Sequence, residues 1–156
     1  MNTKVVSFMW RPASMFAAFA FAFLGVARAQ EPAVTYYVQL IRSSNSEQPP
    51  QAGSRRVGAK LAGTFCGVLK WKSYWEICQR ETAVTPGRTA KVLLSNGRGV
   101  EIDLCKRGKR TVTAFQNGKL VDRTVGPVSE TMTLIGGDHD QKSAWFIVVR
   151  RDKPGG

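Results

Sequence analysis

The basic residues are the groups in this chain with the clearest chemical potential. Seven of them fall in two short groups of the sequence: Lys106, Arg107, Lys109, Arg110, Arg150, Arg151 and Lys153. Guanidinium and ammonium groups bind phosphate and carboxylate through charge-assisted hydrogen bonds. If the two groups meet in the fold, they form a patch that can bind a polyanion. The competing interpretation is a solvated turn whose charges discourage the pairing of edge strands.

The single histidine, His139, lies in the sequence Gly-Gly-Asp-His-Asp at residues 136–140. The two flanking carboxylates suggest metal binding or acid–base chemistry. However, the segment lacks the further ligands of a calcium loop and the second imidazole of common zinc sites. The chain also has no Gly-x-Ser-x-Gly motif of a serine hydrolase. We therefore expect no metal, no cofactor and no catalytic residue. The alternative is a small secreted hydrolase or metal-dependent enzyme centred on His139.

Three cysteines, Cys66, Cys78 and Cys105, leave room for one disulfide in an oxidising compartment. Cys78 and Cys105 come at the trailing ends of two predicted strands. If these strands are neighbours, the thiols can bridge, because a disulfide needs Cα atoms within about 7 Å. If a third strand lies between them, the Cα atoms are roughly 9 to 10 Å apart and the bond is impossible. The sequence leaves both outcomes open.

An aromatic and cationic segment at residues 70–75 combines groups that are found together in carbohydrate and nucleic-acid binders. Its alternation places Trp71 and Trp75 on the apolar face of a strand, which predicts core packing for both. Tyr74 falls on the opposite face, and we expect it to be partly exposed.

The amino-terminal segment predicts export. Lys4 and Arg11 precede an apolar run over residues 13–26, and Ala27-Arg28-Ala29 has the small-x-small pattern of a signal peptidase site. The run is shorter than the roughly 20 apolar residues of a membrane span. We therefore expect a signal peptide at 1–29 and a single exported domain at 30–156, located in the periplasm or outside the cell. No transmembrane anchor is expected after cleavage.

The net charge of the chain is strongly positive. It holds 23 Lys and Arg residues against 11 Asp and Glu residues, a formal net charge of +12. Only three of the cations lie in the predicted signal, so the excess persists in the exported domain. Such a charge favours anionic surroundings such as lipid headgroups, acidic polysaccharide or nucleic acid. The export signal makes nucleic acid the least suitable of these partners.

Short alternating segments separated by turn residues predict a β-rich domain. Eight strands are expected, at residues 35–42, 71–80, 91–94, 100–104, 111–116, 119–125, 131–135 and 144–150. Asn96-Gly97 and Asn117-Gly118 each join two alternating runs, which is a strong hairpin signal. Val57–Leu69 is the one helix candidate, because Val57, Leu61, Phe65 and Val68 share a helical face. The prediction is a β-rich α+β domain of mostly antiparallel strands, arranged as a meander, sandwich or partly closed barrel, with one short helix.

Four segments of this domain resemble small exported bacterial proteins to which no activity is attached. They are YYVQLIR at 36–42, WKSYWEI at 71–77, Gly-Gly-Asp at 136–138 and WFIVVRRDKP at 145–154. The resemblance implies a single exported domain over most of the chain and assigns no site residue.

Three functions follow from these observations as hypotheses. The leading one is a non-enzymatic module of the cell envelope that binds an anionic component, or another protein, through its basic surface. The second is the His139-centred enzyme. The third is an assembly or inhibitor subunit that pairs with its partner through an edge strand.

Overall fold

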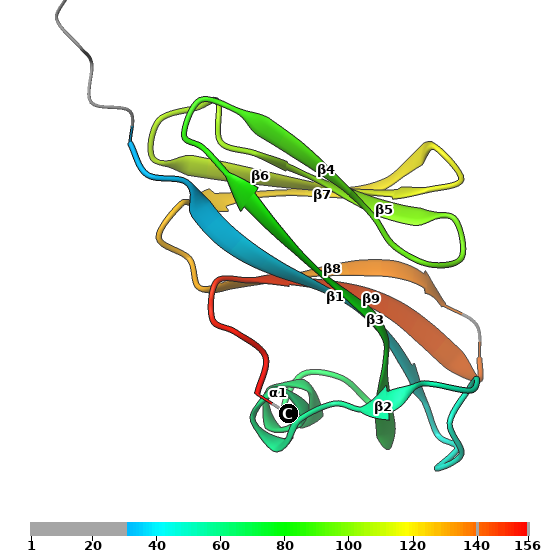
Figure 1. Ribbon diagram of the computed structural model, residues 1–156. Helices are drawn as coiled ribbons and strands as arrows, with labels where there is room; N and C mark the ends of the chain where they lie inside the picture. Colours follow the sequence, from blue (N-terminus) through cyan, green and yellow to red (C-terminus); the bar gives the residue numbers. More distant parts are fainter. Residues whose placement is uncertain (1–30, 140, 156) are drawn as a thin grey trace, which may run out of the picture.

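The structure is a computed structural model that describes residues 31–139 and 141–155, with the side chains of 137–139 left out of the description. The predicted signal peptide at 1–29 lies outside the described residues. Within them the chain forms nine strands in two antiparallel sheets and one short helix (Figure 1). This confirms the predicted β-rich α+β class, and the sheets do not close into a barrel. No helix of the described residues is long and apolar enough to cross a membrane.

The first sheet has five strands in the order β2-β3-β1-β9-β8. Their bounds are β1 Val34–Ser44, β2 Arg55–Arg56, β3 Ser73–Val84, β8 Met132–His139 and β9 Ser143–Arg150. The strand predicted at 35–42 is apolar on both faces and was expected to be central. It is β1, which pairs with β3 on one side and with β9 on the other.

The second sheet is a four-stranded meander in the order β4-β5-β6-β7. Its strands are β4 Thr89–Leu93, β5 Arg98–Asp103, β6 Lys109–Gln116 and β7 Lys119–Pro127. The two predicted Asn-Gly turns join β4 to β5 and β6 to β7. Asn96 and Asn117 have φ of 59° and 51°, the left-handed conformation that such two-residue turns require. The local hairpin signals therefore fix two of the three strand pairings of this sheet.

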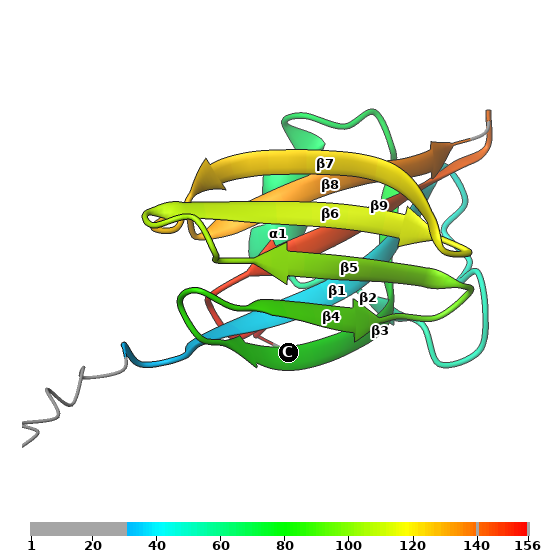
Figure 2. The same ribbon diagram turned by 90° about the horizontal axis from the view of Figure 1, so that it is seen from above.

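The two sheets stack face to face and bury a common core (Figure 2). Side chains of β1 and β9 meet those of β5 and β6 in this core, and the largest of them are fully buried: Tyr36, Val38, Leu40, Val100, Ile102, Val112 and Val149. The alternation of Val100, Ile102 and Leu104 in the sequence correctly predicts their inward position. The outer face of the five-stranded sheet remains available for the helix.

Helix α1, Ala59–Cys66, lies on that outer face (Figure 1). Leu61 and Phe65 are buried against β1, β3 and β9, so the predicted apolar face is correct at these two positions. The helix is shorter than the predicted Val57–Leu69 because it ends at Gly67, and Val68 beyond it is 74% exposed. Tyr74 is buried beneath α1 with its ring 5.0 Å from that of Phe65, so the expectation of partial exposure was wrong.

A β-bulge in β3 changes which residues face the helix side of the sheet. Leu40 of β1 pairs with Cys78, but Ile41 pairs with Glu76, so Ile77 is the extra residue of the bulge. Residues three apart in a regular strand point to opposite faces. The bulge removes this alternation locally and places Glu76 and Gln79 on the same outer face.

Candidate anion-binding site

Two of the seven predicted polyanion-binding residues are buried in internal ion pairs. Arg110 is 1% exposed and donates to the Glu130 carbonyl oxygen and carboxylate, each at 3.0 Å, and to the Thr133 hydroxyl. Its guanidinium carbon also lies 5.4 Å from the centre of the Tyr36 ring. Arg110 therefore ties the second sheet to the first, since β6 carries it and its partners lie in and beside β1 and β8. It has no surface through which to bind a polyanion.

The other buried residue is Arg150, which is 7% exposed. It donates from Nε to Oδ1 of Asp152 at 3.0 Å and from Nη2 to Oδ2 of the same carboxylate. The pKa of the Asp152 carboxyl is lowered, mainly by these hydrogen bonds from Arg150. Asp152 is therefore ionised at neutral pH and keeps the guanidinium in place at the end of β9.

Four of the five exposed residues of the predicted patch line two separate hollows. Lys106, Arg107 and Lys109 line a hollow of about 540 Å³ beside the Pro86-Gly87 turn. Lys153 lines a second and larger hollow, together with Arg150. Arg151 is exposed and lines neither hollow, and its backbone N–H donates to the Thr131 carbonyl oxygen. The two groups thus lie at the same end of the sandwich (Figure 1) but do not merge into one site.

The structure does not bring Cys78 and Cys105 together, and all three cysteines are free thiols. The Cys78 sulfur lies 3.6 Å from the Ser95 hydroxyl, just beyond the end of β4. The Cys105 sulfur lies 3.6 Å from the hydroxyl of Thr89, the first residue of β4. Because a five-residue strand spans about 15 Å, the two sulfurs are well beyond the reach of a disulfide.

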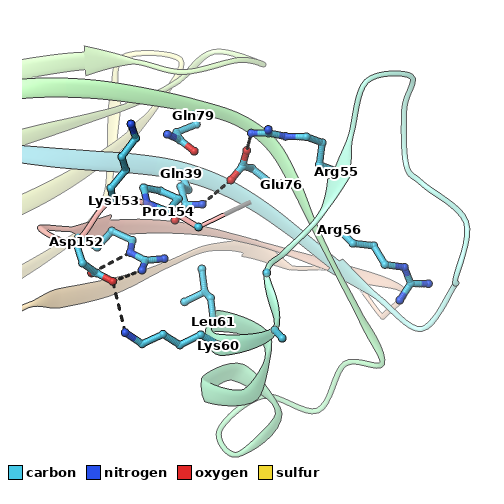
Figure 3. A pocket seen from close by; sticks show the side chains of 14 residues that line it. Gln39, Arg55, Arg56, Lys60, Leu61, Glu76, Gln79, Asp152, Lys153 and Pro154 are labelled. Carbon is cyan, nitrogen blue, oxygen red and sulfur yellow. Dashed lines mark hydrogen bonds and ion pairs between the residues drawn. The ribbon is translucent and has the colours of Figure 1, made fainter.

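The larger hollow is the candidate site. It has a volume of about 690 Å³ and lies between the start of α1, the outer face of β1 and β3, and the carboxyl-terminal tail (Figure 3). Gly58, Ala59 and Lys60 form the helix side. The tail, residues 152–155, forms a further wall next to the helix, and we call the whole hollow the α1 pocket.

A hydrogen-bonded carboxylate and amide lie in the sheet wall of the α1 pocket. Gln39 of β1 donates its Nε2–H to Glu76 at 2.5 Å, and Arg55 of β2 donates to the other oxygen of the same carboxylate. The bulge makes this contact possible because it turns Glu76 toward the face that carries Gln39 and Gln79. Gln39 and Gln79 are direct cross-strand partners.

One polar atom of this wall has no partner among the described residues. The Gln39 side chain is 3% exposed, and its Oε1 is buried without a hydrogen bond. The amide cannot be reversed to satisfy it, because a carboxylate only accepts hydrogen bonds and Glu76 requires the NH₂ end. A buried acceptor of this kind is costly unless a donor reaches it.

The tail wall is held to the helix by ion pairs and close packing. Asp152, already paired with Arg150, lies 3.8 Å from the Lys60 ammonium of α1. The Gly155 carbonyl approaches Gly58 so closely that a Cβ at residue 58 would lie 3.3 Å from it. Glycine at the position before α1 therefore permits the tail to close the pocket.

The start of α1 lies at the pocket and has no cap from the helix's own side chains. Gly58 is the N-cap and provides no capping side chain, and the first turn contains no acidic residue. The free N–H groups of a first turn and the helix dipole together favour an anion at this position. The side chains of the pocket add to this field. Four basic side chains, Arg55, Lys60, Arg150 and Lys153, line it against two acidic ones, Glu76 and Asp152, while the Arg56 side chain points away from the pocket and stacks on Trp75 (Figure 3).

Sequence reasoning found only Arg150 and Lys153 of this pocket. It missed Gln39, Glu76 and Gln79, which lie on strands that were predicted correctly. The helix candidate was itself a usable signal, because a helix N-terminus favours anions, and Arg55 lies just before it in the sequence.

The remaining candidates are placed as follows. Trp75 is 8% exposed with Arg56 stacked over its ring at 4.9 Å, and Trp71 packs at the edge of the α1 cluster. The backbone of His139 ends β8, paired with Ala144. The His139 side chain lies outside the described part of the structure, so the enzyme hypothesis centred on it stays a prediction.

Comparisons with protein-family models, with curated proteins and with solved structures gave no match to this chain.

Proposed function

We propose that the protein is an exported module of the cell envelope that binds an anionic ligand in the α1 pocket. The observation that carries the proposal is the charge of this pocket. Four cationic side chains against two carboxylates line a volume of about 690 Å³, and the start of α1, which has no capping side chain, forms part of its wall. Small-molecule sites have volumes of roughly 300–1,000 Å³, so the hollow suits a defined ligand. The export signal at 1–29 supports the location.

The two carboxylates of the pocket, Glu76 and Asp152, are each paired with an arginine. Their charges are therefore balanced within the wall, which supports a binding role for the remaining cations. Arg55 binds Glu76, and Arg150 binds Asp152 through both of its oxygens. Such pairs fix the direction of a guanidinium group. The exposed ammonium group of Lys153 then remains available to a ligand, and that of Lys60 is held only by its exposed 3.8 Å contact with Asp152. In this proposal the basic turn at Lys106–Lys109 is a secondary contact for a long polyanion that extends along the same end of the sandwich.

Edge-strand pairing is less well supported as a second function. The edge strand β7 exposes Leu120, Val121 and Val125, which are apolar groups that a partner strand would cover. However, β7 has a register shift opposite Ala114 and Phe115, and it carries Arg123 and ends at Pro127. Bulges, charges and proline are the features that protect edge strands from pairing.

Charge reversal in the pocket tests the proposed function. We expect the parent protein to be retained on heparin at low salt and released as salt rises, since screening weakens contacts between exposed charges. The Lys60→Glu/Lys153→Glu variant is expected to lose most of this retention. Both lysines are exposed, so the fold should tolerate the changes, and an unchanged melting temperature verifies this.

Two matched variants carry the same change in net charge elsewhere. Lys106→Glu/Lys109→Glu alters the basic turn, and Lys72→Glu/Lys119→Glu alters exposed positions away from both hollows. The proposal predicts a smaller loss for the turn and the smallest for the remote pair. Equal losses from all three variants, or no retention of the parent protein at low salt, would contradict it.

A further inference from the structure

We propose that the ligand of the α1 pocket is an acidic saccharide, a unit that carries hydroxyl groups next to a carboxylate. This inference rests on the proposed function and adds the chemical class of the ligand. It follows from the arrangement of acceptors and donors on the walls of the pocket.

The sheet wall of the pocket requires hydrogen-bond donors from a ligand. The Gln39 Oε1 is a buried acceptor without a partner, and the neighbouring Glu76 is a carboxylate that only accepts. The Gln79 amide, opposite Gln39 in the sheet, can donate and accept. Hydroxyl groups match this wall because each one donates a proton and also has lone pairs to accept one.

The helix side of the pocket requires an anion. The first turn of α1 directs its N–H groups and dipole into the hollow, and Lys60 extends from the same turn. Figure 3 shows Lys60 on one side of the pocket and Glu76, Gln39 and Gln79 on the other. A ligand that satisfies both sides therefore carries its charge at one end and its hydroxyl groups at the other.

A simple phosphate polyanion fits only half of this arrangement. It offers few donors at neutral pH, so Gln39 Oε1 would stay unsatisfied, and its charge would be repelled by Glu76. A neutral sugar fits the other half only, because it leaves the helix end and Lys60 without a counter-charge. A hexuronate unit has both features within one ring.

The tail covers one side of the pocket, and its attachment there is weak enough for an entering ligand to displace the tail. Pro154 of the tail and Gln39 of the sheet both line the pocket (Figure 3). The tail is attached at this point through the Arg150–Asp152–Lys60 contacts, of which the Lys60 contact is long, at 3.8 Å, and exposed. Exposed pairs of this kind contribute little, so a ligand carboxylate can replace Asp152 at Lys60 while Arg150 keeps Asp152.

Binding of three probes to the full exported domain tests the inference. The probes are oligogalacturonate, the neutral galactose oligomer of equal length, and inorganic tripolyphosphate, each measured by calorimetry at fixed ionic strength. We expect oligogalacturonate to bind at least about tenfold more tightly than either other probe, since the loss of one or two hydrogen bonds corresponds to this factor.

Two variants separate hydroxyl recognition from charge. Gln79→Leu, at a half-buried position, should weaken oligogalacturonate binding by about five- to tenfold and leave tripolyphosphate binding unchanged. Gln39→Met, which keeps the length of the side chain, should act in the same direction in a protein whose melting curve shows it folded. Lys60→Glu/Lys153→Glu should weaken both anionic probes.

The outcomes distinguish the two proposals. If tripolyphosphate binds as tightly as oligogalacturonate and Gln79→Leu changes neither affinity, the saccharide inference is wrong while anion binding stands. If the neutral oligomer binds as tightly as oligogalacturonate, or if no anionic probe binds, the proposed function is wrong and the inference falls with it.

Discussion

Arg110→Ala is expected to lower the free energy of unfolding by about 2–4 kcal/mol, because it truncates a fully buried side chain and leaves its hydrogen-bond partners unpaired. The Arg110 side chain has no exposed surface and bonds Glu130 and Thr133 while lying over the Tyr36 ring. Its removal leaves a cavity between the sheets and takes the counter-charge from Glu130. Urea denaturation followed by tryptophan fluorescence measures the loss.

The control for this prediction is Arg107→Ala in the same basic turn. Arg107 is exposed, so its replacement should change stability by no more than about 0.5 kcal/mol. Equal effects of the two substitutions would show that Arg110 does not hold the sheets together. The same contrast means that extending a charge reversal from Lys106, Arg107 and Lys109 to Arg110 would unfold the protein, so binding tests must leave Arg110 intact.

Phe65→Ala is expected to cost about 3–5 kcal/mol and to weaken anion binding at the same time. Phe65 is 1% exposed and is the largest apolar contact of α1 with the sheet, against Tyr74, Ile41 and Val148. Large-to-small changes of buried aromatic residues have this cost because a cavity remains. Since the first turn of α1 forms a wall of the pocket, a helix that leaves the sheet also removes the helix end from the site.

Denaturation and heparin retention of the same variant check both effects. Val68→Ala, just past the helix at a position that is 74% exposed, is the matched control and should change neither. A Phe65→Ala protein that loses stability but binds heparin as the parent does would show that the helix is not part of the binding site.

The parts of the fold that depend on local signals were predictable from the sequence. Asn96-Gly97 and Asn117-Gly118 set their hairpins through the left-handed conformation of two residues, and the alternation of β5 followed from its pleat. The two apolar faces of β1 predicted its central place correctly. The helix end was misplaced because Gly67 stops α1 before Val68, and a glycine within an apolar helical pattern is an ambiguous stop signal.

The candidate site was mostly not predictable, because non-local geometry creates it. Gln39 and Glu76 are 37 residues apart, and they meet only because the bulge at Ile77 turns Glu76 to the outer face. No residue pattern around Ile77 predicts the bulge. The same limit explains why the burial of Tyr74 was not predicted, since it depends on the position of α1 over the sheet. It also applies to Arg110, because an alternation pattern does not distinguish this buried arginine from the exposed cations of the preceding turn.

The most direct test of the α1 pocket as the anion site is chemical-shift mapping of the exported domain with oligogalacturonate. The account predicts that the largest backbone and side-chain amide shifts occur at Gln39, Ala59, Lys60 and Gln79, with smaller shifts in the basic turn. It also predicts that the shifts reach saturation as the probe is added. Shifts confined to Lys106–Lys109, with the amides of Gln39 and Ala59 unmoved, would contradict it.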